Sequence, residues 1–239
     1  EYDAFNRQTA IIDAEGGITR FTYDPDGNVE SLTDPVGNVT RYVRDADGRV
    51  REEIDPTGAA KHLEYDATGN VTRITDRNGL VRTFAYDAMN RQTAENWLDA
   101  AGVTVRTISS RYDAVGNLVD ISDPDARLTF SFDVSNRMTT ATTEYPGTAI
   151  PKVTLTYGYD ANGNRISAAD NSGVHVDSRF DERNRLESRI WQGGGIAPAR
   201  VAFAYYADGG RKSTTRFADA TGTTVLGATA YDQFANGLT

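Results

Sequence analysis

Few residues in this chain could perform chemistry, and they are scattered. His62 and His175 are the only two histidines among 239 residues, and there is no cysteine. A catalytic triad or a histidine metal site would need one of them beside a second reactive group, and no Gly-x-Ser-x-Gly nucleophile elbow occurs. The lack of cysteine excludes disulfides, thiolate nucleophiles and cysteine-bound zinc. We therefore interpret both histidines as ordinary strand residues and expect no catalytic residue, metal or cofactor.

Pairs of carboxylates recur in short loops, as in Asp24-Pro25-Asp26 and Asp45-Ala46-Asp47. An EF-hand calcium loop needs Gly at its sixth position and Glu at its twelfth, whereas Gly stands fourth here, which is typical of a β-turn. The run Gly193-Gly194-Gly195 is not followed by Lys and Ser or Thr, so it favours a hairpin tip over a phosphate-binding loop. These patterns indicate turns.

The same loop pattern recurs along the whole chain. It consists of an aromatic residue, Asp, two variable residues, Gly or Asn, and then Asn or Arg. The starts at positions 2, 23, 44, 65 and 86 are 21 residues apart, and eleven starts occur up to Tyr231. Arg44 replaces the aromatic residue in one copy, and Tyr206-Ala207-Asp208 is a degraded copy. We identify as the repeat signature Tyr2, Asp3, Tyr23, Asp24, Gly27, Asp45, Gly48, Tyr65, Asp66, Gly69, Tyr86, Asp87, Tyr112, Asp113, Gly116, Phe132, Asp133, Tyr159, Asp160, Gly163, Phe180, Asp181, Tyr231 and Asp232.

A second turn signal stands midway in each repeat, as in Asp34-Pro35-Val36-Gly37 and Asp55-Pro56-Thr57-Gly58. Both signals indicate the same kind of turn. The Asp side chain accepts hydrogen bonds from the backbone that follows it, and Gly three residues later adopts positive φ. Such a turn closes a short hairpin with a bulge. Asn also adopts positive φ readily, and it replaces Gly at Asn6, Asn90, Asn136 and Asn184.

The segments between turns have strand length and no helical period. Before each Tyr-Asp turn, the repeated aromatic residue shares a face with an apolar residue two positions earlier, such as Phe21, Leu63 or Phe84. The intervening residues are mostly polar, so we expect one buried and one solvated face. The fold class is therefore all-β, with about twenty strands in tandem β-hairpins. Because twist accumulates in wide sheets, we expect a curved, spiralling antiparallel ribbon.

Composition narrows the function further. The chain has 25 Lys and Arg against 34 Asp and Glu, a net charge of −9, which argues against a nucleic-acid partner. No apolar run has the length of about 18 residues that a membrane-spanning helix needs, so we expect no membrane insertion. The chain starts at Glu1 inside a repeat, which indicates a fragment whose export signal lies elsewhere.

The periodic Tyr-Asp-x-x-Gly-(Asn/Arg), with Asp-Pro-x-Gly between copies, resembles the YD repeat of the RHS family. That family includes bacterial Rhs and wall-associated polymorphic toxins, B and C components of insecticidal toxin complexes, and teneurins. The resemblance covers residues 1–239 as a single array and implies a large secreted or cell-surface β-shell, a hollow cocoon of spiralling strands. In the toxins such a shell encloses a C-terminal effector, and in teneurins it serves adhesion. Neither the RHS core nor an effector is recognisable here, so the expectation concerns the shell wall.

Three functions stay open at this stage. The first is the structural wall of a secreted bacterial RHS protein, whose partners are neighbouring repeats, an RHS core and an enclosed C-terminal toxin. The second is an adhesion protein that binds carbohydrate or a surface receptor, for which the tyrosines could form a stacking ladder. The third is an enzyme such as a glycan hydrolase, although every candidate carboxylate belongs to the repeat. Tyrosines that share a face with Phe and Leu favour packing over sugar binding.

The turn pattern makes a prediction about backbone strain. Gly27, Gly48, Gly69 and Gly116 should have positive φ, so Gly69→Val should lower the free energy of unfolding by about 1–3 kcal/mol. Ala at Thr68 should be nearly neutral. Denaturant melts of the two variants measure the difference, and equal losses would show that the turn register is wrong.

Overall fold

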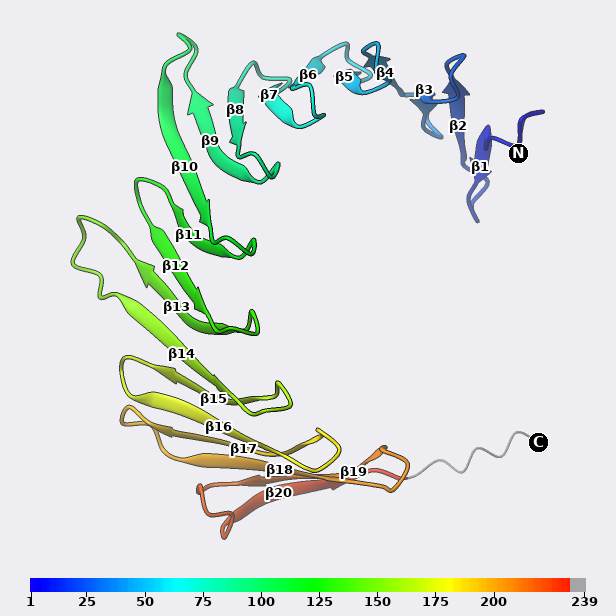
Figure 1. The fold of residues 1–239 in the computed structure, drawn as a ribbon. Helices are drawn as coiled ribbons and strands as arrows, with labels where there is room; N and C mark the ends of the chain where they lie inside the picture. Colours follow the sequence, from blue (N-terminus) through cyan, green and yellow to red (C-terminus); the bar gives the residue numbers. More distant parts are fainter. Residues whose placement is uncertain (233–239) are drawn as a thin grey trace, which may run out of the picture. The chain divides into compact units, whose positions relative to one another are not determined.

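The computed structural model describes residues 1–232 and is built from strands alone in that range (Figure 1). It contains twenty β-strands and no helix within the described residues, which confirms the all-β, antiparallel hairpin fold. Tyr231 and Asp232 stand at the limit of this range. The remainder of the last repeat motif, residues 233–236, lies outside the described residues.

The chain divides into two compact units, Glu1–Ser110 and Arg111–Thr239. The first unit holds β1 Ala10–Ile12, β2 Ile18–Tyr23, β3 Val29–Thr33, β4 Val39–Arg44, β5 Val50–Ile54, β6 Ala60–Tyr65, β7 Val71–Thr75, β8 Val81–Tyr86, β9 Gln92–Leu98 and most of β10 Thr104–Tyr112. The second holds β11 Leu118–Ser122, β12 Arg127–Phe132, β13 Met138–Glu144, β14 Val153–Tyr159, β15 Arg165–Asp170, β16 Val174–Phe180, β17 Leu186–Gly193, β18 Ala199–Tyr205, β19 Arg211–Phe217 and β20 Val225–Ala230.

Within each unit, every strand pairs antiparallel with the next strand along the chain. Successive turns therefore fall at opposite ends of the strands, with Tyr-Asp turns at one end and Asp-Pro-x-Gly turns at the other. Strands of seven to nine residues occur where the repeat interval exceeds 21, for example β10 and β17. This matches the expectation of extended hairpins at those intervals.

Both turn signals produce the same loop. In the Asp34 turn, the Asp34 N–H donates to the Asn38 carbonyl at 2.9 Å, and the Gly37 N–H donates to the Asp34 carbonyl at 3.0 Å. The Asp34 carboxylate also accepts hydrogen bonds from the Val36 and Asn38 N–H groups, at 3.0 and 2.8 Å. The Asp66 turn repeats these four bonds with Thr68, Gly69 and Asn70. One aspartate per turn thus satisfies the loop backbone.

The Tyr-Asp turns differ from the others by a shift in register. Opposite the repeated aromatic residue the partner strand holds one extra residue, as between Thr22 and Tyr23, and between Glu64 and Tyr65. This is the bulge expected of a hairpin closed by a residue with positive φ. Along its own strand, each aromatic residue lies on the same face as the side chain two residues earlier, and we call this the tyrosine face.

Neither face of the sheet is a closed core. Phe21, Leu63 and Tyr65 on the tyrosine face are half-buried, and among the described apolar residues only Ala10 is buried. The chain exposes 15481 Å², whereas a compact monomer of this mass exposes about 10,500 Å². The expectation of one buried face was therefore wrong for the described residues, because a single layer of strands leaves the apolar side chains of the tyrosine face half-exposed.

The four glycines named above have φ between 79° and 101°, as predicted, and Asn6, Asn90, Asn136 and Asn184 have φ between 58° and 61°. No atom lies within 4 Å of a Cβ built on Gly69, so the cost of Gly69→Val is backbone strain alone. The expectation that Thr68→Ala is nearly neutral needs correction, because the Thr68 hydroxyl donates to Asp66 at 2.8 Å. Met89, at the same place in the next repeat and 65% exposed, is the better control when changed to Ala.

Candidate functional site

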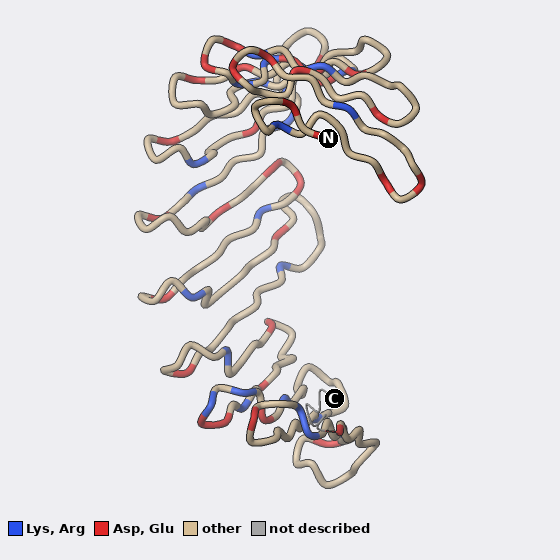
Figure 2. The backbone as a smooth tube through the Cα atoms, turned by 90° about the vertical axis from the view of Figure 1, so that its right-hand side faces the viewer, with Lys and Arg blue, Asp and Glu red and all other residues tan. Residues whose placement is uncertain are grey.

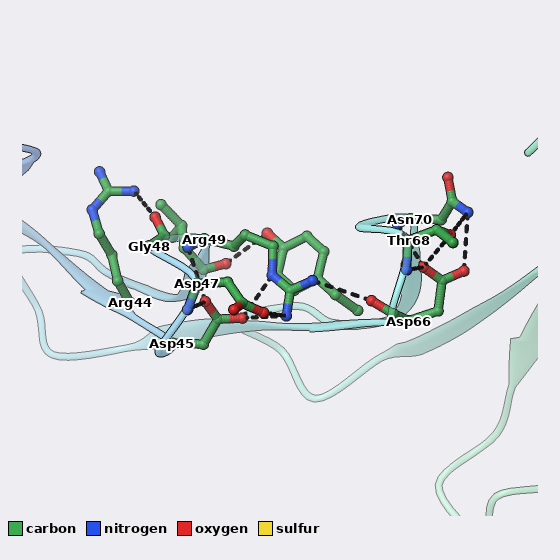
Figure 3. A network of polar contacts seen from close by, with 10 residues as sticks. Arg44, Asp45, Asp47, Gly48, Arg49, Asp66, Thr68 and Asn70 are labelled. Atoms are coloured by element: carbon green, nitrogen blue, oxygen red, sulfur yellow. Dashed lines mark hydrogen bonds and ion pairs between the residues drawn. The ribbon is translucent and has the colours of Figure 1, made fainter.

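The residues of the repeat signature gather at the end of the sheet where the Tyr-Asp turns lie. We call this set of turns, with the Arg or Asn that closes each one, the tyrosine rim. Figure 3 shows two neighbouring turns of the rim, those of Asp45 and Asp66. Their side chains form one continuous polar network in which each turn contacts the next.

An arginine that closes a turn binds the aspartate that opens it. Arg49 donates from its backbone N–H to Asp45 Oδ1 at 2.9 Å and from Nε to Oδ2 at 2.8 Å. Its Nη2 lies 2.8 Å from the same carboxylate, which makes the contact a two-point, charge-assisted pair. The same pair joins Arg7 to Asp3, Arg91 to Asp87, Arg137 to Asp133 and Arg185 to Asp181.

The same arginine also reaches the following Tyr-Asp turn. The Arg49 guanidinium lies 4.8 Å from the ring centre of Tyr65, and its Nη1 donates to the Asp66 carbonyl at 3.1 Å (Figure 3). Equivalent ring contacts join Arg7 to Tyr23, Arg137 to Tyr159 and Arg185 to Tyr205, at 4.5 to 4.8 Å. A guanidinium at this distance over an aromatic face is a favourable cation–π contact.

The hydroxyl of the repeated tyrosine donates a hydrogen bond to the preceding repeat. Tyr65 Oη donates to the Val50 carbonyl at 2.7 Å, and Tyr86 Oη to the Val71 carbonyl at 2.8 Å. Each acceptor is the first residue after the preceding Tyr-Asp loop. Tyr23, Tyr159 and Tyr205 donate to Gln8, Met138 and Leu186 in the same way. The hydroxyls of these tyrosines therefore join neighbouring repeats.

Arg44 takes over the tyrosine's role in the copy that lacks the aromatic residue. Its Nη2 donates to the Val29 carbonyl at 3.2 Å, and Val29 is the first residue after the preceding loop. Its Nη1 donates to the Gly48 carbonyl at 3.0 Å within its own turn. The repeat therefore tolerates Arg here because it reaches the same acceptor as Tyr.

One repeat start needs correction. The spacing placed the aromatic position at Tyr206, but Tyr205 holds that position, with its hydroxyl on Leu186 and the Arg185 guanidinium over its ring. Tyr206 stands where other turns have Asp: its N–H donates to the Gly210 carbonyl at 2.8 Å. Asp208 serves instead as the side-chain acceptor for the Gly210 N–H.

Three turns that end in Asn connect to the next turn through side-chain amides. Asn70 Nδ2 donates to Asp66 at 2.9 Å and to Asn90 Oδ1 at 2.9 Å. Asn117 and Asn164 donate likewise to Asn136 and Asn184, at 3.2 and 2.9 Å. The residue with positive φ in one turn therefore accepts a bond from the turn before it.

The hydrogen bonds at the turns keep their carboxylates ionised. The pKa of Asp66 is lowered to about 2, because the side chains of Asn70 and Thr68 and then both backbone N–H groups donate to it. A side-chain donor is also the main cause that lowers the pKa of Asp34, Asp55, Asp87, Asp113, Asp160 and Asp170. Such carboxylates are acceptors and poor proton donors.

The histidines lie in strands, as expected, one in each unit. His62 in β6 lies 3.8 Å from Glu52, and His175 in β16 lies 3.7 Å from Asp177. Within residues 1–232 there is no cluster of three or more His, Cys, Asp or Glu side chains that could hold a metal.

The acidic residues concentrate at the hairpin ends, where Figure 2 shows them in red. The same range has no helix long and apolar enough to cross a membrane.

The family model of the RHS Repeat matches residues 2–39, 23–60, 65–96 and 112–148, which together are more than half of the chain. The chain belongs to the RHS repeat family. This confirms the resemblance that the sequence motifs indicated. No curated protein sequence matches the chain significantly.

Solved structures give the same fold for this RHS repeat chain. The crystal structure of TcdB2–TccC3 with Cdc42 matches at a TM-score of 0.55 and 17% identity, over 83% of this chain and 13% of its own. The Tc holotoxin pore of Photorhabdus luminescens matches at 0.55 and 17%, over 84% and 14%. TcdB2–TccC3 without its hypervariable C-terminal region matches at 0.55 and 17%, over 84% and 13%. The chain thus spans about one-seventh of these proteins, and at this identity the likeness concerns the fold alone.

Sequence reasoning missed the closing residue of the RHS repeat. Arg49 and its equivalents make contacts to both turns, yet the motif gave its last position, Asn or Arg, no role. The signal was present, because that position is restricted to Asn or Arg in most copies. Both residues can donate from the backbone and from the side chain to one aspartate.

The tyrosine contacts predict a measurable loss on removing one hydroxyl. Tyr65→Phe should lower the free energy of unfolding by about 0.5–1.5 kcal/mol, because the Val50 carbonyl loses its donor. The matched control is Tyr42→Phe, since the Tyr42 hydroxyl makes no hydrogen bond within the described residues. Urea melts measure both, and an equal loss in the two variants would contradict the role of the rim.

The lowered pKa values predict acid sensitivity. Because the pKa of Asp66 is about 2 in the fold and about 3.9 in an unfolded chain, its ionised form contributes stability above pH 4. That stability is lost as the pH falls from about 4 towards 2. The urea midpoint should therefore stay flat from pH 8 to 5 and fall below pH 4. Asp66→Asn should reduce this fall, whereas Asp26→Asn, whose side chain accepts no bond in the fold, should leave it unchanged.

Proposed function

We propose that this chain is a segment of the wall of a secreted RHS-repeat shell that encloses a C-terminal toxin or effector domain. The observation that carries this proposal is the tyrosine rim, whose Asp, Arg and Tyr residues tie each hairpin to its neighbour with the same contacts. A surface built for recognition would leave these side chains available to a ligand. In this structure the Asp, Arg and Tyr side chains of the rim instead bond to neighbouring repeats.

The single layer of strands supports a role as a wall. Antiparallel pairing runs from hairpin to hairpin, so backbone hydrogen bonds are satisfied along each unit and loops are short. Short, hydrogen-bonded loops offer few sites for proteases, and continuous pairing leaves few free edges. These properties suit a container that must keep its contents from the surrounding medium.

The family and the solved structures support the same proposal. The chain shares its fold with TcdB2–TccC3 structures, one of which lacks a hypervariable C-terminal region. By analogy, we propose that the parent of this chain also has an RHS core and a variable C-terminal cargo. Export to the outside of a bacterial cell would follow from a signal elsewhere in the parent.

A non-enzymatic role is part of the proposal. A general acid needs a carboxyl group whose pKa is raised towards neutral pH. The rim carboxylates have lowered pKa values and their oxygens are occupied by turn hydrogen bonds. We therefore assign them to structure.

The test uses the parent protein expressed with and without its C-terminal region. With an intact wall, the C-terminal region should resist protease at concentrations that digest it when it is expressed alone. Breaking the rim with Asp66→Ala and Asp87→Ala should make that region sensitive to digestion. Asp26→Ala with Glu15→Ala removes the same charge from exposed positions without bonded partners and should preserve protection.

Several outcomes would overturn the proposal. Protection that survives the rim variant, or a C-terminal region that is digested in both proteins, would remove the encapsulation role. A parent that ends soon after the repeats and binds a glycan or receptor would favour the adhesion function instead. Turnover of a glycan, peptide or nucleic acid that is abolished at one carboxylate would show an enzyme.

A further inference from the structure

A small pocket lies on the tyrosine face of the second unit, over strands β15 to β17, away from the tyrosine rim. Its volume is about 160 Å³. Its lining includes Arg165, Ala168, Val176, Ser178, Arg189 and Trp191. It combines two cationic side chains with an apolar floor, which distinguishes it from the turn network.

Strand register brings these residues together. Val176 of β16 pairs with Trp191 of β17, and two residues later Ser178 pairs with Arg189. Ala168 of β15 pairs with Val176 on its other side. Directly paired residues share a face, so Ala168 and Val176 form the floor, Trp191 one wall and Arg189 another.

Arg189 is held in place by one bond that leaves the rest of its guanidinium free. Its Nε donates to Ser178 Oγ at 3.1 Å, and Ser178 is only 8% exposed. The edge that carries both Nη groups has no carboxylate partner among the described residues. Arg165 likewise forms no ion pair within residues 1–232, and its guanidinium lies 5.2 Å from the centre of the Tyr157 ring.

Both faces of the second unit carry arginines. Arginines on the tyrosine face are Arg165, Arg189, Arg211 and Arg216, by their pairing with Tyr159, Ser178, Tyr205 and Val201. The strand carboxylates Asp120, Glu144 and Asp177 fall on the opposite face, where Asp120 pairs with Arg127 at 2.6 Å. Asp170, which pairs with Leu155, lies on the tyrosine face, and its carboxylate accepts backbone hydrogen bonds of its own turn.

We propose that this pocket binds a carboxylate on a short aliphatic stem, which is the side chain of Asp or Glu in an acidic polypeptide segment. Two parallel N–H groups on the Nη edge of Arg189 match the two oxygens of a carboxylate, and Arg165 adds a second positive charge. The floor of Ala168 and Val176 and the ring of Trp191 pack against the methylene groups of the stem. A free phosphate would gain nothing from that apolar floor. The assignment does not depend on the shell function.

The fluorescence of Trp191 can be used to follow binding to the pocket. In the 239-residue chain with Trp97→Phe, Trp191 is the only remaining tryptophan, since the sequence contains two. Titration with N-acetylglutamic acid α-amide should change its fluorescence to saturation, in the range of millimolar dissociation constants. The neutral N-acetylglutamine amide should produce no saturable change, and added salt should weaken the binding of the acid.

Variants locate the site. Arg189→Gln should weaken binding about tenfold or more, and Arg165→Gln by a smaller factor, because each removes one cation. Arg189→Lys keeps the charge but loses the two-point geometry, so its affinity should fall between those of Arg189→Gln and the parent chain. Arg179→Gln is the matched control, since Arg179 is exposed on the opposite face of β16. Far-UV circular dichroism checks that each variant is folded.

Three results would overturn the proposal. The first is the absence of a saturable response to the acid in folded protein. The second is an equal response to the neutral amide or an equal effect of Arg179→Gln. The third is tighter binding of inorganic phosphate than of the glutamic acid amide, which would replace the carboxylate with a different oxyanion.

Discussion

The hydrogen bonds from loop N–H groups to the aspartate that opens each turn are the interaction on which the rest of this structure depends. In the Asp66 turn one carboxylate accepts from the Thr68 and Asn70 backbone and from the Asn70 side chain. This arrangement lets a loop of three residues reverse the chain. It also positions the closing Asn or Arg, whose side chain then points towards the next turn. Without it, neither the strand register nor the contacts between repeats would be defined.

Stability in such an array comes from contacts between neighbours rather than from a core. Many hairpins contribute a tyrosine hydroxyl to the turn before them, as Tyr65 does to Val50. Many also contribute an arginine or asparagine to the turn after them, as Arg49 does to the ring of Tyr65. In repeat proteins the free energy is approximately a sum of repeat and interface contributions. The half-buried faces are consistent with this, because apolar burial within the described chain is limited.

Charge pairing differs between the turns and the strands. At the turns, in both units, arginine pairs with the aspartate of its own loop, as Arg137 does with Asp133. In the strands, opposite charges pair in both units, as Arg82 does with Glu95 and Arg127 with Asp120. The tyrosine face of the second unit also carries arginines beside aromatic rings, such as Arg211 over Phe203 at 4.7 Å. A net charge of −9 therefore conceals a locally basic surface.

The sequence by itself determined the all-β fold, the hairpin unit, the positions of nearly all turns and the positive φ of glycines and asparagines such as Gly69 and Asn90. These features are local, since each depends on the chemistry of four or five consecutive residues. Only the tertiary structure decided which residues meet across strands: Arg44 replacing a tyrosine, Tyr205 rather than Tyr206 as the repeat position, and Arg189 beside Ser178. Those contacts join residues 11 to 19 positions apart. They depend on the one-residue register shift at each Tyr-Asp turn, which changes the residue that faces each side chain across the sheet.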